Sequence, residues 1–158
     1  MGTIIKTANF REGAGKEFEV ISSLKKNLII FIVSSETEND FYNIIDIKTN
    51  KEGYVHKSCV KLGPAIKENE EGVFTLDEES MNYDPEVEVY NSTDLPMTLK
   101  CNETVYEFDA RETKKITLTP GSIKYRASAP GVIPYIGIDK LKPNYNYSWK
   151  FYIETRRK

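Results

Sequence analysis

The sequence has few of the side chains on which most enzymes depend. It contains a single histidine, His56, so any cysteine–histidine or serine–histidine mechanism would have to use that residue. Ser58 and Cys59 are its nearest candidate partners, but side chains in a closing strand and the turn after it are expected to point in different directions. No carboxylate near His56 in the sequence is placed to orient its ring. We therefore assign no catalytic residue and predict that the chain is not an enzyme.

Metal and cofactor motifs are also missing. Cys59 and Cys101 are the only cysteines, and neither has further metal-ligating residues at a useful spacing. They fall in different halves of the chain, which argues against a disulfide. Asp109, Glu112 and Asp139 could supply a carboxylate pair for hydrolysis, but a chain with 24 acidic residues always offers such pairs. No metal and no cofactor is expected.

Long apolar runs and helical periodicity are absent as well. The most apolar stretch, "NLIIFIVSS", is the length of a strand and far short of the roughly 18 residues that a membrane span needs. No membrane span is therefore expected. Met1-Gly2 is followed directly by a strand pattern, which leaves no room for a signal peptide. The compartment stays open between the cytoplasm and, if the start has been trimmed, an extracytoplasmic location.

Charge is balanced overall and uneven locally. The net charge of −2 gives no reason to expect a nucleic-acid partner. Residues 1–62 carry nine basic and eight acidic residues, residues 63–90 one basic and nine acidic, and residues 91–158 twelve basic and seven acidic. The acidic middle contains glycine and proline and breaks the strand rhythm. Residues 63–84 are therefore predicted to be a linker, to which "GVFTL" could add one strand.

Short β-branched and aromatic runs fill the rest of the chain. Residues 1–62 contain "GTIIKT", "FEVIS", "LIIFIVSS", "DFYNIIDIK" and "GYVH", separated by turn residues. Five or six strands in this length predict a small barrel or sandwich. Residues 85–158 show six or seven further strands, including "EVEVYN" and "NYSWKFYIET", with clean alternation. The predicted fold is all-β, with a small first domain and an immunoglobulin-like sandwich over residues 85–158.

Three details of the second half can be predicted from local pattern. Trp149 should be buried or half-buried beside Phe151 or Tyr147. Pro120-Gly121 suits a type II turn. The irregular stretch "ASAPGVIPYIG" is predicted to be a long crossover loop fixed by its two prolines.

Residues 3–62 resemble a bacterial SH3-like domain. "TANFREGAGKEFEVISSLKKN" has the family's asparagine, arginine, glycine-containing loop, aromatic and Val-Ile, and "NDFYNIIDIKTNKEGYVHKSCVKL" has its paired aromatics, tight turn and closing strand. The matching positions are Asn9, Arg11, Gly13, Gly15, Phe18, Phe41, Gly53, Tyr54 and Val55. Two departures are Phe41, where the family often has tryptophan, and the long stretch 44–50. Residues 85–158 resemble small immunoglobulin-like sandwich modules of bacterial proteins.

The resemblance implies a non-catalytic module that binds a peptide, a cell-wall component such as peptidoglycan, or an envelope protein. The candidate ligand-binding residues are Phe10, Arg11, Phe18, Phe41, Tyr42, Tyr54 and His56. Arg11 has an alternative role, because its five donors suit it to cap carbonyls of the glycine-rich loop. A structural subunit of an envelope or mobile-element assembly is the second interpretation, and a hydrolase the third. The oligomeric state stays open.

Overall fold

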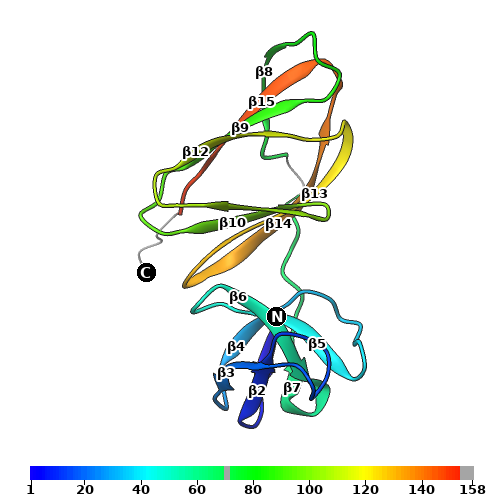
Figure 1. Ribbon diagram of the computed structural model, residues 1–158, viewed down its shortest axis with the longest axis vertical. Helices are drawn as coiled ribbons and strands as arrows, with labels where there is room; N and C mark the ends of the chain where they lie inside the picture. The colour runs from blue at the N-terminus through cyan, green and yellow to red at the C-terminus, as the bar shows by residue number, and fades with distance from the viewer. Residues whose placement is uncertain (70–71, 154–158) are drawn as a thin grey trace. The chain divides into compact units, whose positions relative to one another are not determined.

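The computed structural model describes residues 1–69 and 72–153 and is all-β, with no α-helix among those residues (Figure 1). The chain divides into two compact units, Met1–Ile66 and Lys67–Lys158. The division falls inside the predicted linker, near its start. Most of that acidic segment therefore belongs to the second unit.

The first unit is built on one seven-stranded sheet in the order β3-β2-β6-β5-β4-β1-β7. The strands are β1 (Gly2–Ile4), β2 (Ala8–Arg11), β3 (Val20–Leu24), β4 (Ile29–Ile32), β5 (Phe41–Asp46), β6 (Lys51–His56) and β7 (Val60–Leu62). All of its strand pairs are antiparallel. A short 3₁₀ turn, η1 (Lys57–Cys59), joins β6 to β7.

Alternation along the strands gives the first unit its core. In β2, Ala8 and Phe10 are buried while Asn9 is exposed, as a period of two requires. Phe10, Ile44 and Val55 are each 0% exposed and belong to one apolar cluster. β2, β5 and β6 therefore each contribute a fully buried side chain to the core of the first unit.

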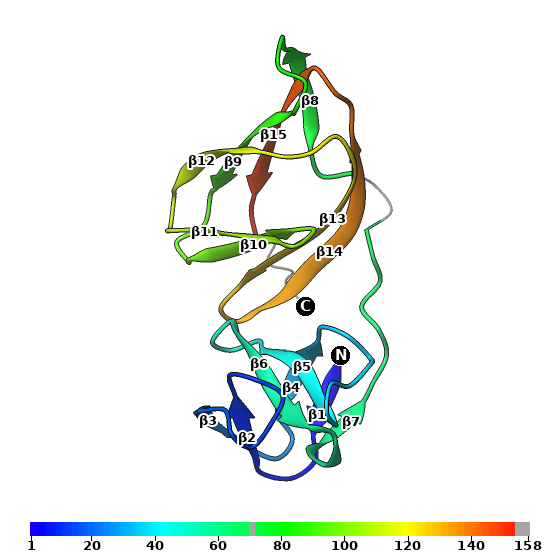
Figure 2. The same ribbon diagram turned by 45° about the vertical axis from the view of Figure 1, so that its right-hand side comes forward.

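The second unit is a sandwich of two four-stranded sheets, β11-β10-β13-β14 and β12-β9-β15-β8 (Figure 2). Its strands are β8 (Thr75–Glu79), β9 (Glu86–Asn91), β10 (Met97–Cys101), β11 (Thr104–Phe108), β12 (Thr113–Thr117), β13 (Gly121–Ala129), β14 (Val132–Leu141) and β15 (Tyr145–Phe151). Most pairs are antiparallel, whereas β9 and β15 run parallel. Part of the predicted strand "NYSWKFYIET" lies beyond residue 153 and outside the described residues.

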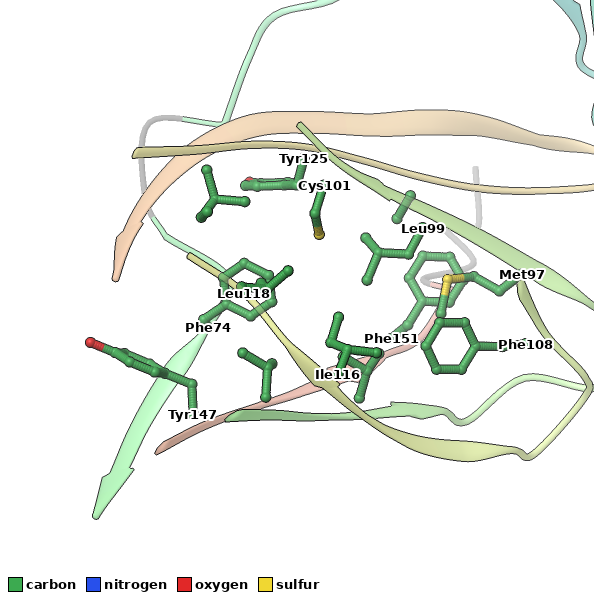
Figure 3. Packing of buried hydrophobic residues seen from close by; sticks show 14 of the residues in the cluster. Phe74, Met97, Leu99, Cys101, Phe108, Ile116, Leu118, Tyr125, Tyr147 and Phe151 are labelled. Carbon is green, nitrogen blue, oxygen red and sulfur yellow. The ribbon is translucent and has the colours of Figure 1, made fainter. Parts of the chain in front are cut away.

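Apolar side chains of both sheets fill the space between them (Figure 3). Leu99, Cys101 and Tyr125 come from one sheet, and Ile116 and Phe151 from the other. Trp149 is half-buried, and its ring centroid lies 5.8 Å from that of Phe151, which confirms its predicted place.

The acidic segment contributes to this sandwich. β8 pairs antiparallel with β15 and forms the edge of its sheet. Phe74 is buried, and its ring centroid lies 5.9 Å from that of Trp149. The Phe74 N–H donates to Asp139 Oδ2 at 2.9 Å, which ties the segment to β14. The sandwich thus begins before residue 85.

The prediction of a long crossover loop is wrong. β13 and β14 form a hairpin that turns at Pro130-Gly131, where Gly131 has a φ of +78°. Proline fixes one turn residue and glycine tolerates the left-handed one, so two residues reverse the chain. Pro134 is tolerated because β14 is an edge strand. At the other predicted turn, Gly121 has a φ of +114°.

Neither cysteine forms a disulfide. Cys101 is 2% exposed in the sandwich core, where burial raises the pKa of its thiol to about 12. Cys59 is half-buried in η1.

Candidate functional site

One face of β5 and β6 gathers most of the predicted ligand-binding side chains. Phe41 pairs with His56, Asn43 with Tyr54, and Ile45 with Glu52. Directly paired residues share a face, so these side chains lie together, and Arg11 of β2 joins them through its pairing with Tyr54. We call this surface the Tyr54 face and define it by Arg11, Phe41, Asn43, Glu52, Tyr54 and His56. Tyr42, Ile44 and Val55 lie on the opposite face.

Arg11 organises the glycine-rich loop of residues 12–19. Its Nη1 donates to the carbonyls of Lys16 at 3.1 Å and Phe18 at 3.0 Å, which confirms the predicted carbonyl-capping role. Gly13 is needed because an added Cβ would lie 2.5 Å from the Phe18 ring. Phe18 is therefore held across the loop with 45% of its surface exposed.

A second loop, residues 33–40, borders the same face. Glu38 and Phe41 exchange two backbone hydrogen bonds, of 2.9 and 2.8 Å, which fold the loop back onto the start of β5. Asn39 Nδ2 donates to the Ala14 carbonyl at 3.4 Å and so links this loop to the glycine-rich one. This hydrogen bond connects the two loops directly.

Tyr54 lies in a negative environment. Its pKa is raised above the ordinary value by burial and then by the carboxylates of Glu38 and Glu52. Asn43 Nδ2 donates to Glu52 Oε2 at 3.2 Å, while the buried Asn43 Oδ1 has no hydrogen-bond partner in the described part of the chain. The charges of two carboxylates therefore act on the phenol.

Replacing Glu38 by glutamine is expected to lower the pKa of Tyr54. A nearby carboxylate disfavours the phenolate, so removing its charge makes deprotonation easier. The pKa is measured by phenolate absorbance, with the titration of Tyr54→Phe subtracted to isolate this tyrosine. Glu19→Gln, which neutralises an exposed carboxylate of the glycine-rich loop, is the matched control. An unchanged Tyr54 titration in Glu38→Gln would contradict the arrangement of the second loop.

His56 and Ser58 contact each other, so the prediction that they point apart is wrong. His56 Nδ1 lies 2.8 Å from Ser58 Oγ and also accepts the Ser58 N–H at 3.2 Å. The ring thus caps η1, and the neutral imidazole carries its proton on Nε2. No carboxylate hydrogen-bonds to this ring within residues 1–69 and 72–153, and Asp40 pairs with Lys57 at 3.0 Å. A serine–histidine pair without a carboxylate to orient the ring lacks one of the three groups of a catalytic triad.

The other candidates differ in how much surface they present. Phe10 is 0% exposed on the core face, so we remove it from the ligand-binding set. Tyr42 is half-buried and packs against the same core. Phe41 is 6% exposed, and its ring meets the edge of His56 at 5.2 Å between centroids. Phe18 and the half-buried Tyr54 remain the aromatics that a ligand could contact.

Sequence reasoning missed Glu38, Asn43 and Glu52. Two of them carried a usable signal, since Asn43 lies two residues after Phe41 and Glu52 two before Tyr54, which puts them on the same faces of their strands. Glu38 lies in a loop, where no periodicity applies. Only the folded loop brings its charge to Tyr54.

Comparison with known proteins gives no relative, since no family model, no curated protein and no solved structure matches the chain. Within the described residues, no group of three or more histidine, cysteine, aspartate or glutamate side chains is placed to hold a metal ion. No helix in the same part of the chain is long and apolar enough to cross a membrane.

Proposed function

We propose that the chain is a non-catalytic binding or adaptor protein that receives an extended peptide segment on the Tyr54 face of its first unit. In this proposal the first unit is a bacterial SH3-like barrel and the second an immunoglobulin-like sandwich. The ligand is a peptide, a cell-wall component such as peptidoglycan, or a segment of an envelope protein.

The observation that carries the proposal is the position of Tyr54 beside Arg11, which holds the glycine-rich loop, and within reach of the Glu38 charge of the second loop. A half-buried tyrosine offers a flat ring and a polar tip, which suits it to stack on an extended backbone and to hydrogen-bond to it. Phe18 adds an exposed ring on the glycine-rich loop. Because Arg11 and Asn39 hold the loop backbones, little conformational freedom would be lost on binding.

The charge of the loops indicates which peptides fit. Residues 12–19 carry three glutamates and one lysine, and residues 33–40 carry two glutamates and one aspartate. Glu52, whose Oε2 accepts the Asn43 Nδ2 hydrogen, adds a further carboxylate on the face itself. Backbone N–H groups and amines are the complementary donors. The preferred ligand is therefore a peptide with at least one amino group or basic side chain near the point where it contacts Tyr54.

Tyr54→Ala is expected to weaken binding of soluble muropeptides by about tenfold or more, as loss of a central interface tyrosine does. Isothermal titration calorimetry with a defined muropeptide mixture measures this, and co-sedimentation with intact peptidoglycan provides a second readout. Tyr152→Ala, which removes a tyrosine that is 60% exposed in the second unit, is the matched control and should bind as the parent does.

An equal loss of affinity in Tyr54→Ala and Tyr152→Ala would place the binding outside the Tyr54 face. The same preparations also separate binding from catalysis, because a hydrolase would shorten the muropeptides during the titration. Cleavage that disappears in His56→Ala would replace the binding proposal with the hydrolase interpretation.

A further inference from the structure

The second unit exposes an acidic, apolar projection at the connection between β8 and β9. Met81 is 101% and Tyr83 65% exposed, although both are large apolar side chains. The neighbouring carboxylates are Asp77, Glu78, Glu79 and Asp84, and residues 75–86 contain no lysine or arginine. We call residues 77–84 the acidic tip. Exposed apolar side chains grouped in this way are unusual on a monomer's surface.

Hydrogen bonds hold the tip in one conformation. Asn144, in the left-handed region at a φ of 63°, accepts the Ser80 N–H at 2.8 Å through its carbonyl and donates its own N–H to the Tyr83 carbonyl at 3.1 Å. Its Nδ2 donates to the Asn82 carbonyl at 3.2 Å. Met81 and Tyr83 are therefore displayed on an organised turn, which lowers the entropy cost of docking them.

A complementary surface lies on the outer face of the β11-β10-β13-β14 sheet. Tyr125 and Leu99 point into the core, so their strand neighbours Lys124 and Lys100 point outward. Val105 pairs with Lys100, Ile138 pairs with Lys124, and Lys140 follows two residues after Ile138 on the same face. Val105 is 51% and Ile138 47% exposed. We call these five residues the basic face.

No ion pair recorded within residues 1–69 and 72–153 neutralises the three lysines of the basic face. The ion pairs recorded for residues 1–69 and 72–153 join Lys57 to Asp40, Arg111 to Asp94, Lys114 to Glu112 and Lys115 to Glu86. None of these pairs involves the basic face or the acidic tip. Both surfaces thus keep their charge available to another molecule.

We propose that the acidic tip of one copy docks on the basic face of a second copy. The acidic tip combines exposed apolar side chains with negative charge, and the basic face combines them with three lysines, so the two are complementary in both respects. Glu107 of β11 also lies on the outer face of the sheet, two residues from Val105. A lipid surface suits the tip less well, because anionic headgroups repel its carboxylates. Tip and face are different surfaces, so the contact is heterologous and can continue from copy to copy. The contact is independent of the Tyr54 face.

The test is the oligomeric state of the full chain by sedimentation velocity and light scattering. Self-association is expected with a dissociation constant of about 10 µM to 1 mM, as for small transient interfaces, and it should weaken as salt shortens the Debye length. A tip variant, Glu78→Lys with Glu79→Lys and Met81→Ser, and a face variant, Lys100→Glu with Lys124→Glu, should each be monomeric. Lys25→Glu with Lys26→Glu, the same charge change on the first unit, should associate as the parent does.

Mixing the tip variant with the face variant is decisive. The tip variant keeps an intact face and the face variant an intact tip, so the mixture is expected to associate although neither variant does so alone. A parent that stays monomeric at about 1 mM, the upper end of the expected range of dissociation constants, would overturn the proposal. So would association that neither variant changes, or a mixture that stays monomeric. Binding of the monomeric parent to phosphatidylcholine vesicles, lost in the tip variant, would assign the tip to lipid instead.

Discussion

Phe10→Ala is expected to lower the free energy of unfolding of the first unit by about 3–5 kcal/mol. The ring is 0% exposed and lies in the cluster that holds Ile44 and Val55, so its removal leaves a cavity where the strands meet. Denaturant unfolding followed by far-UV circular dichroism measures the loss. Trp149, the only tryptophan, lies in the second unit, so its fluorescence transition is an internal control that should not move.

Phe18→Ala is the matched substitution on the glycine-rich loop. Its ring is 45% exposed and covers Gly13, so we expect a loss below about 1 kcal/mol. Similar losses for the two phenylalanines would contradict the assignment of Phe10 to the core and of Phe18 to the surface.

Asn91→Ala is expected to lower the free energy of unfolding of the second unit by about 2–4 kcal/mol. Asn91 is 0% exposed, and its Nδ2 donates to the carbonyls of Leu95 at 2.7 Å and Asp109 at 3.0 Å. Its Oδ1 accepts the Thr93 N–H at 3.1 Å and the Thr93 hydroxyl at 2.7 Å. Alanine leaves these groups without a side-chain partner at the end of β9. The Trp149 fluorescence transition is the measurement.

Asn102→Ala is the control for this substitution. Asn102 is exposed in the β10–β11 turn, where its Oδ1 accepts a single backbone N–H, from Lys124 at 2.9 Å. A loss of about 1 kcal/mol is expected. If Asn91→Ala were no more destabilising than this, the buried network would contribute little. Asn91 also begins an Asn-Ser-Thr glycosylation triplet, and its burial makes the folded position inaccessible to modification.

The strand pattern predicted the all-β fold because the alternation of apolar and polar residues depends only on neighbours in the sequence. Val87 and Val89 are buried while Glu88 between them is exposed, as "EVEVY" indicates. β14 was missed for a physical reason. The prolines and glycines of "ASAPGVIPYIG", which leads into β14, suggest irregular backbone, but Pro130-Gly131 makes a tight turn before the strand and Pro134 lies on an edge strand.

The candidate site was predictable only in part. The sequence identified Phe41, Tyr54 and His56 as candidate ligand-binding residues on predicted strands, and it predicted that Arg11 could cap the glycine-rich loop. Phe10 was included in the ligand-binding set although the apolar–polar alternation of Ala8-Asn9-Phe10-Arg11 already puts its ring on the buried face of β2. The sequence could not predict that His56 turns toward Ser58, since that depends on η1.

The sequence by itself determined the structural class, the positions of most strands, the place of Trp149 and the scarcity of catalytic side chains, because composition and period-two alternation depend only on neighbouring residues. The tertiary structure decided where the acidic segment belongs, which aromatics remain exposed, and how Glu38 comes to act on Tyr54. Those outcomes depend on strand order and loop closure, which bring together residues far apart in the chain, and no local pattern encodes them.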